Sequence, residues 1–197
     1  MNKVYAVLYP LIWIYMKLLH PWKAVGVERV PEGAALLCGN HSTLGDPLYV
    51  VCCMGWRRQV RVMAKEEVMK WPILGFLLRK AGIFGVKRGK ADVGALKEAM
   101  RILRGGEKLL MFPQGTRVKD GEDSEARTGA AMFATRTGAP IVPIYIPTKK
   151  RRFRRTTIVF GEPYHPEFEG RKPTPEDYQR IADDLMERVR ALEEQAA

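Results

Sequence analysis

Cysteine and histidine are scarce in this sequence, with three of each among 197 residues. Cys38, Cys52 and Cys53 form no C-x-x-C motif, and an odd number with one adjacent pair is a poor basis for a disulfide framework. The scarcity excludes a disulfide-stapled domain and favours free thiols in a reducing compartment.

Long hydrophobic runs are also missing, although the N-terminus approaches one. Residues 4–19 are apolar or aromatic except for Lys17. As a helix they would extend roughly 24 Å, short of the membrane hydrocarbon core of about 30 Å. No small-residue cleavage site follows, which excludes a secretory signal peptide. Because aromatic rings settle at lipid headgroup level, we predict a helical membrane-interface segment over residues 1–22, with a buried terminal helix as the alternative. Its rings are Tyr5, Tyr9, Trp13, Tyr15 and Trp22.

The rest of the chain contains no internal repeat and no low-complexity tract. Hydrophobic residues make up 46% of the chain and charged residues 28%, a composition that excludes extended disorder. A chain of 197 residues can bury one sizeable core but is too short for two enzymatic domains. We therefore predict a single domain over residues 23–197.

Short β-rich runs alternate with helical patterns in this domain. The alternation predicts an α/β fold with a mixed central sheet flanked by helices. Strands are expected at 34–38, 60–64, 82–86, 108–112, 140–146 and 156–160. Helices are expected at 47–54, 66–79, 91–104 and 129–138. An amphipathic C-terminal helix should follow Thr174, because that residue is a good cap and a proline with two acidic residues comes next.

His41 is the only histidine with a carboxylate close by and turn-forming residues between the two. On a continuous helix, positions five apart diverge by about 140°, so His41 and Asp46 can meet only across a turn. Asn40 and Gly45 suit that turn, and Pro47 suits the start of a helix with Asp46 as its cap. A carboxylate bound to one imidazole nitrogen leaves the other nitrogen to accept a hydroxyl proton. The alternative is a helix cap beside a polar loop residue.

Four ordered segments resemble the conserved blocks of a known family. NHSTLGDP at 40–47 resembles the NHxxxxD block of the glycerolipid acyltransferases, which include the lysophosphatidate acyltransferases. GIFGVKR at 82–88, FPQGTR at 112–117 and IVPIYI at 141–146 are similar to further blocks of that family, in the same order and approximate spacing. The resemblance covers roughly residues 25–165, and the apolar N-terminus also looks like the family's membrane-binding element.

The resemblance implies a role for each matching position. His41 would be the general base and Asp46 its orienting carboxylate, while Pro143 would help to shape the site. No metal and no cofactor would be needed, since the acyl donor is a substrate, either acyl-coenzyme A or an acylated acyl carrier protein. Planar guanidinium groups match phosphate oxygens, and the positions implied to bind the phosphate of the acceptor are Arg88, Gly115, Thr116 and Arg117.

One site-shaping position departs from the family pattern. Gln114 stands where the third block commonly has a glutamate. If the carboxylate mainly supports neighbouring donors by hydrogen bonding, glutamine can substitute for it. If its charge tunes a nearby arginine, phosphate affinity or substrate choice will differ. We expect the activity to be retained.

The chain is strongly basic, with a formal net charge of +11 and a pI near 9.7. Six of the seven residues at 149–155 are Lys or Arg, and the seventh, Phe153, could stack on a base. No nucleic-acid recognition motif accompanies this cluster, and the other basic residues are spread through the chain. We therefore expect no nucleic-acid partner, and we assign the cluster to anionic lipid headgroups or to the acyl donor. A solvated loop is the alternative.

We expect a membrane-associated, monotopic enzyme on the cytoplasmic face. Its expected reaction moves a fatty acyl group from a thioester to the sn-2 hydroxyl of 1-acyl-glycerol-3-phosphate, a lysophospholipid, and gives phosphatidate for phospholipid biosynthesis. One alternative is a sister acyltransferase that acts on glycerol-3-phosphate or another lysolipid. The other is a non-catalytic basic protein that binds membranes or nucleic acid.

Overall fold

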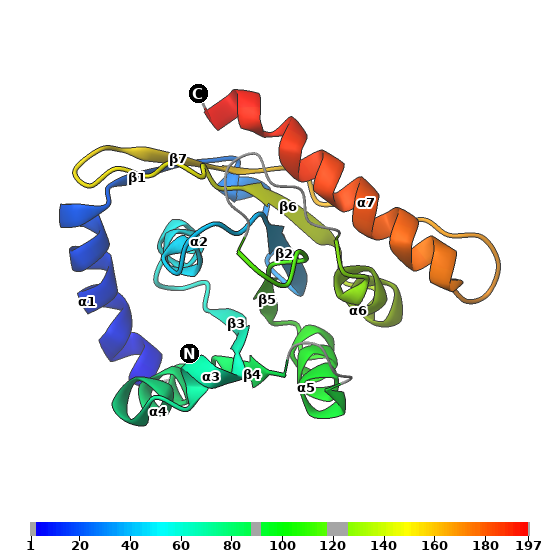
Figure 1. Cartoon of the computed structure of the whole chain (residues 1–197), viewed down its shortest axis with the longest axis horizontal. Helices are drawn as coiled ribbons and strands as arrows, with labels where there is room; N and C mark the ends of the chain where they lie inside the picture. Colours follow the sequence, from blue (N-terminus) through cyan, green and yellow to red (C-terminus); the bar gives the residue numbers. More distant parts are fainter. Residues whose placement is uncertain (1–2, 88–91, 118–125, 197) are drawn as a thin grey trace.

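The computed structural model of the protein describes residues 3–87, 92–117 and 126–196. The centre of the molecule is a seven-stranded sheet with strand order β1-β7-β6-β2-β5-β3-β4, and helices cover both of its faces (Figure 1). The predicted α/β fold with a mixed sheet is confirmed. The strands are β1 (Trp22–Val25), β2 (Ala35–Gly39), β3 (Val60–Lys65), β4 (Phe84–Val86), β5 (Lys108–Met111), β6 (Ile141–Tyr145) and β7 (Thr156–Phe160).

The direction of the strands decides where a site can form. The neighbours β6, β2, β5, β3 and β4 are all parallel, whereas β7 is antiparallel to β6 and parallel to β1. The carboxyl ends of the five parallel strands therefore lie at one edge of the sheet. Open α/β sheets bind their ligands at this edge.

Side chains of the central strands alternate between two helical layers. Leu37 and Leu110 pack in the core beneath α1 and α2, and Leu36 and Leu109 pack beneath α5, α6 and α7. The residues of β2 and β5 are all buried, as expected where both faces of a parallel sheet are covered. The helices are α1 (Lys3–Leu19), α2 (Asp46–Met54), α3 (Glu66–Met69), α4 (Pro72–Lys80), α5 (Val93–Arg104), α6 (Gly129–Thr137) and α7 (Pro175–Ala191).

Two elements differ from the sequence prediction. The helix expected at 66–79 is divided into α3 and α4, because Trp71 is extended (φ −64°, ψ 128°) and a residue before proline avoids the helical region. Strand β1 was not predicted at all. It starts at Trp22, within the expected interface segment, and pairs with β7.

The C-terminal helix agrees with its prediction. The Thr174 hydroxyl accepts a bond from the Asp177 amide, and the Asp177 carboxylate accepts one from the Thr174 amide. This reciprocal pair is a capping box, and the apolar face of α7 packs on the sheet.

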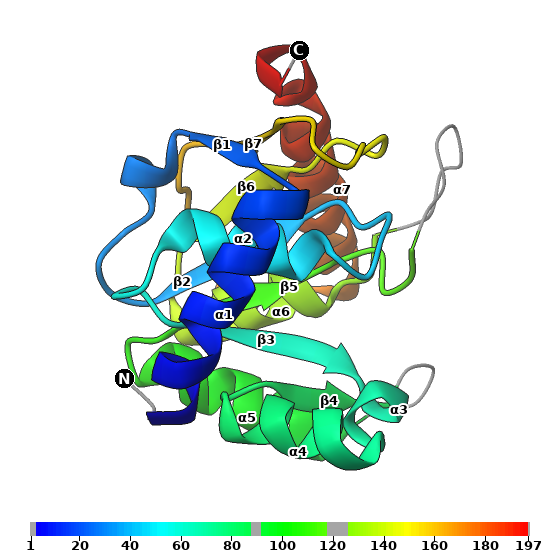
Figure 2. The same cartoon turned by 90° about the vertical axis from the view of Figure 1, so that its left-hand side faces the viewer.

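The N-terminal helix α1 has one buried face and one exposed face. Tyr5, Tyr9 and Met16 are buried against α2 and α4, while Leu11 and Leu18 are 61% and 67% exposed. Figure 2 shows α1 lying across this face of the molecule with α4 near its first turns. Within the described ranges, no helix is long and apolar enough to cross a membrane.

Candidate active site

Three loops meet at the carboxyl edge of the sheet. His41 follows β2, Gln114 follows β5 and Lys150 follows β6. Asn40 ties two of these loops together, because its Nδ2 donates to the Ile146 carbonyl (2.7 Å) and its Oδ1 accepts from the Ile146 amide (2.8 Å). The side chain thus continues the pairing of β2 with β6 beyond the end of both strands.

His41 and Asp46 form a buried pair. The distance from His41 Nδ1 to Asp46 Oδ2 is 2.9 Å, and the two side chains are 8% and 0% exposed. A turn closed by the Asp46 amide on the Thr43 carbonyl (3.2 Å) brings them together. With Nδ1 engaged, Nε2 is the nitrogen that can accept a proton from a substrate hydroxyl.

The Asp46 carboxylate does not cap the helix, so that part of the prediction was wrong. Helix α2 begins at Asp46 itself, with Gly45 in the cap position. The carboxylate turns back instead. Its Oδ2 accepts bonds from the amides of Ser42 (2.7 Å) and Thr43 (2.8 Å), and its Oδ1 accepts one from the Thr43 hydroxyl (2.7 Å).

A buried ammonium completes the surroundings of this carboxylate. Lys150 Nζ lies 2.9 Å from Asp46 Oδ1, although in the sequence Lys150 belongs to the basic cluster at 149–155. Burial raises the pKa of Asp46, but the His41 hydrogen bond, the charge of Lys150 and the Thr43 donors outweigh it and hold that pKa well below its usual range. Asp46 is therefore ionised at neutral pH.

The loop after β5 supports His41 from the other side. Gln114 Oε1 accepts a hydrogen bond from the His41 amide (3.1 Å). The Phe112 ring stacks on the imidazole, with centroids 4.1 Å apart and an interplanar angle of 16°. Gln114 was predicted from the sequence as a site-shaping residue, but its bond to the His41 amide was not. The contact of Phe112 with His41 was not predicted either.

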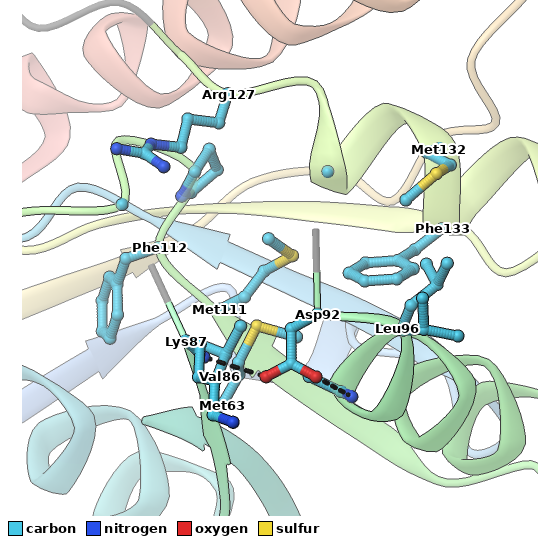
Figure 3. Close-up of a pocket in the computed structure, with 15 residues that line it drawn as sticks. Met63, Val86, Lys87, Asp92, Leu96, Met111, Phe112, Arg127, Met132 and Phe133 are labelled. Atoms are coloured by element: carbon cyan, nitrogen blue, oxygen red, sulfur yellow. Dashed lines mark hydrogen bonds between the residues drawn. The ribbon is translucent and has the colours of Figure 1, made fainter. Parts of the chain in front are cut away.

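A largely apolar cavity of about 420 Å³ opens beside Phe112. Its volume lies within the usual range for small-molecule sites. Figure 3 shows the side chains of Met63, Met111, Leu96 and Phe133 gathered there from β3, β5, α5 and α6. Because Phe112 also touches His41, the cavity and the His41–Asp46 pair are neighbours.

The other predicted site residues are Pro143 and those implied to bind the phosphate of the acceptor. Gly115 adopts φ +67°, and a Cβ on it would lie 2.6 Å from Arg127 Nε. Thr116 and Arg117 are exposed beyond this turn, and Arg88 lies outside the described residues. Pro143 is buried within β6, opposite Cys38 of β2.

Two cationic residues at the cavity were missed by the sequence analysis. Lys87 follows β4 and Arg127 precedes α6, and both line the cavity (Figure 3). The signal for Lys87 was its place beside Arg88 in the second block. Arg127 carries no sequence signal, because only the fold brings it over the Gly115 turn.

Known proteins share this arrangement of segments. Residues 22–147 match the family model described as Acyltransferase, a range that contains all four motif blocks. The chain belongs to this acyltransferase family. The match includes His41 and Asp46, as well as the loops that carry Phe112 and Gln114.

Individual acyltransferases are similar over parts of the chain. The chain is 31% identical over 123 residues to a chloroplastic 1-acyl-sn-glycerol-3-phosphate acyltransferase of Arabidopsis thaliana, covering 60% of this chain but only 34% of that protein. It is 29% identical over 140 residues to the enzyme of that name from Bacillus subtilis, covering 68% and 69% of the two chains. The chain thus spans about a third of the length of its plant relative.

A solved structure shares the fold of this acyltransferase. The 1-acyl-sn-glycerophosphate acyltransferase of Thermotoga maritima superposes with a TM-score of 0.70, at 22% identity, over 99% of this chain and 79% of the other. At that identity the likeness establishes the fold.

Asp46→Asn should destabilise the protein by about 3–5 kcal/mol at pH 7, because it leaves the Lys150 ammonium buried without a carboxylate. Since the pKa of Asp46 is lowered by folding, the unfolded chain takes up the proton first as the pH falls, near the ordinary value of about 3.9. The stabilisation by ionised Asp46 is therefore complete above that value and is lost as the pH falls through the folded pKa.

The measurement is urea unfolding between pH 7 and pH 3. The free energy of unfolding should fall less steeply with decreasing pH for Asp46→Asn than for the wild type. The variant Glu169→Gln, which removes an exposed carboxylate, is the control and should lose less stability at pH 7. Equal acid slopes for Asp46→Asn and the wild type would contradict this role.

Proposed function

We propose that the protein transfers a fatty acyl group from an acyl thioester to the sn-2 hydroxyl of 1-acyl-glycerol-3-phosphate, giving phosphatidate. The observation that carries the proposal is the buried His41–Asp46 pair, with 2.9 Å between Nδ1 and Oδ2, beside an apolar cavity at the carboxyl edge of the sheet. Curated relatives named as 1-acyl-sn-glycerol-3-phosphate acyltransferases support the choice of acceptor.

In the proposed reaction His41 Nε2 removes the proton from the acceptor hydroxyl as its oxygen attacks the thioester carbonyl carbon. The new carbon–oxygen bond forms and the carbon–sulfur bond breaks. The departing thiolate then accepts the proton from the imidazolium. Asp46 fixes the imidazole orientation and stabilises its charged form. The enzyme therefore acts as a base and forms no covalent intermediate of its own.

The proposed place of the donor's acyl chain is the cavity beside Phe112. Its lining is mainly apolar, so burying a hydrocarbon chain there is favourable by about 0.8 kcal/mol per methylene. Phe112 lines the cavity and stacks on His41, which would bring the thioester close to the base. Acyl-coenzyme A and acylated acyl carrier protein are both anionic donors suited to a chain of net charge +11.

The proposed phosphate site of the acceptor surrounds the Gly115 turn. Gly115, Thr116 and Arg117 keep the roles that the motif implies, and Arg88 would join them from the second block. We add Arg127, which lies against the Gly115 turn, and Lys87, which adjoins Arg88 in the second block, because cationic groups bind phosphate strongly.

The proposed membrane contact is the exposed side of α1 and α4. Val7, Leu11, Ile14 and Leu18 are spaced along one face of α1, and Ile73 on α4 is 78% exposed. Exposed apolar side chains gathered along one helix face are typical of an interaction site.

A basic loop adjoins one end of this surface. The Phe153 amide donates to the Leu19 carbonyl at the end of α1 (2.9 Å), and the Phe153 side chain is 70% exposed. The arginines at 151, 152, 154 and 155 are exposed around it. Such charges favour the anionic cytoplasmic leaflet of a membrane, where we place the enzyme as a monotopic protein.

His41→Ala should lower kcat/KM for phosphatidate formation by about 10²–10⁴-fold, the usual contribution of a general base. The assay offers lysophosphatidate with either acyl-coenzyme A or acylated acyl carrier protein. His165→Ala, which removes an exposed histidine, is the matched control and should stay within about twofold, since it leaves the proposed base in place. Phosphatidate formation that does not depend on His41, or that is absent from the wild type with both donors, would overturn the proposal.

Gln114→Glu should change kcat/KM by less than about tenfold, because a carboxylate oxygen can accept the same bond from the His41 amide. Gln114→Leu removes that acceptor and should lower kcat/KM by roughly 10–100-fold. Steady-state kinetics with lysophosphatidate distinguish the two variants. A gain of about 100-fold or more in Gln114→Glu would instead mean that glutamine impairs this site.

Leu11→Asp combined with Leu18→Asp should abolish sedimentation with vesicles of anionic phospholipid, because two charges would enter the proposed apolar contact surface. The control is Ala191→Asp with Gln195→Asp, which adds the same charge at exposed positions near the C-terminus and should reduce binding only slightly. Circular dichroism checks that both variants fold. Equal vesicle binding by the two double variants would exclude α1 as the contact surface.

A further inference from the structure

Lys150 does not belong to the basic surface that surrounds it in sequence. Residues 151–155 are exposed, whereas the Lys150 side chain is 7% exposed. Its Nζ donates to Ser42 Oγ (2.9 Å) and to the Pro147 carbonyl (2.5 Å), and it lies 2.9 Å from Asp46 Oδ1. An ammonium has three donors, so these three contacts satisfy it fully.

A buried ammonium is costly unless it is paired and fully hydrogen-bonded. The partner of Lys150 is the same carboxylate that holds His41, and the two contacts fall on different oxygens. Oδ2 bonds His41 Nδ1, while Oδ1 faces Lys150. The carboxylate can therefore bind both groups at once without competition between them.

We propose that Lys150 is a positioning residue of the active site that keeps His41 unprotonated between turnovers by balancing the negative charge of Asp46. Asp46 alone would favour a buried imidazolium, which cannot accept a proton from the substrate. With Lys150 in place, the Asp46 carboxylate, the Lys150 ammonium and a neutral His41 imidazole together have no net charge. This inference rests on the proposed role of His41 as the base.

Among the residues that the structure describes, the other groups in contact with this cluster do not supply the balance. Tyr49 of α2 is close to Asp46, and burial raises the pKa of its phenol, so it is neutral near pH 7. Gln114 and Phe112, from the loop after β5, carry no charge. His20 packs against the Tyr49 ring, with centroids 6.5 Å apart, and it remains unchanged in every Lys150 variant.

The test is the pH dependence of kcat/KM for transfer from oleoyl-coenzyme A to lysophosphatidate. In Lys150→Met and Lys150→Gln the acidic limb should move to higher pH by about one pH unit or more, the effect of a charge within a few ångströms. The KM for lysophosphatidate should change little. Lys150→Arg keeps the charge and should restore the limb toward the wild-type position.

Two kinetic results from the Lys150 variants would overturn the inference. One is an equal loss of rate at every pH with the limb unmoved, which indicates a structural role. The other is a raised KM with an unchanged limb, which indicates that Lys150 binds substrate. If neither neutral variant folds, the wild type decides, because the inference requires the imidazole to be neutral at neutral pH. Half-maximal kcat/KM above pH 7.5 in the wild type would mean that Lys150 does not balance Asp46.

Failure of the proposed function gives a different pattern. If the wild type makes no phosphatidate at any pH, the acyl-transfer proposal fails, and the charge balance is then read directly from the imidazole. The chain has only three histidines, so the His41 ring signal in an NMR titration is assigned by its loss in His41→Ala. Its midpoint should be higher in Lys150→Gln than in the wild type, and equal midpoints would overturn the inference.

Discussion

The site depends on one buried carboxylate. Asp46 has no exposed surface and is contacted by His41 Nδ1, the amides of Ser42 and Thr43, the Thr43 hydroxyl and Lys150 Nζ. An ionised carboxylate is stable in such a place only while these donors remain, because burying an unpaired charge costs several kcal/mol. The need to satisfy Asp46 therefore fixes the loop after β2, the start of α2 and the loop after β6 relative to one another.

The parallel strands make this convergence possible. β6, β2 and β5 are neighbours with their carboxyl ends at one edge, so the loops that leave them emerge side by side. Asn40 binds the backbone of Ile146, and Gln114 binds the backbone of His41. Side chains thus bridge adjacent loops where the strand ladder has ended. A group placed on a loop gains in this way the rigidity of the sheet behind it.

Residues close in sequence were the predictable part of the site. His41 and Asp46 are separated by a short segment whose turn-forming residues could be recognised, and the strands could be predicted from alternating β-rich and helical patterns. Lys150 could not be predicted to point inward, because a run of like charges contains no sign of which member pairs with the buried Asp46, far earlier in the chain. Arg127 carried no sequence signal, because only the fold brings it over the Gly115 turn. In α1 the sequence indicated apolar character, but only the packing against α2 shows which face remains exposed. The break before Pro72 is predictable from the sequence, because a residue before proline avoids the helical region.

A general base has two opposing requirements. It must be neutral before the reaction, and its charged form must be stabilised while it holds the proton; the best compromise has both forms accessible near the working pH. If His41 is the base, as proposed, Asp46 serves the second requirement, since its carboxylate bonds the imidazole directly, and the inferred role of Lys150 serves the first from the opposite oxygen. Both partners are fixed in place before substrate arrives, so no reorganisation is needed when the proton moves. The stacked Phe112 ring covers one face of the imidazole and borders the cavity, which keeps water from that face. If the acyl chain lies in that cavity, the thiolate departs close to His41 and takes the proton from the imidazolium. The imidazole is then neutral again, and the charge balance around Asp46 is restored.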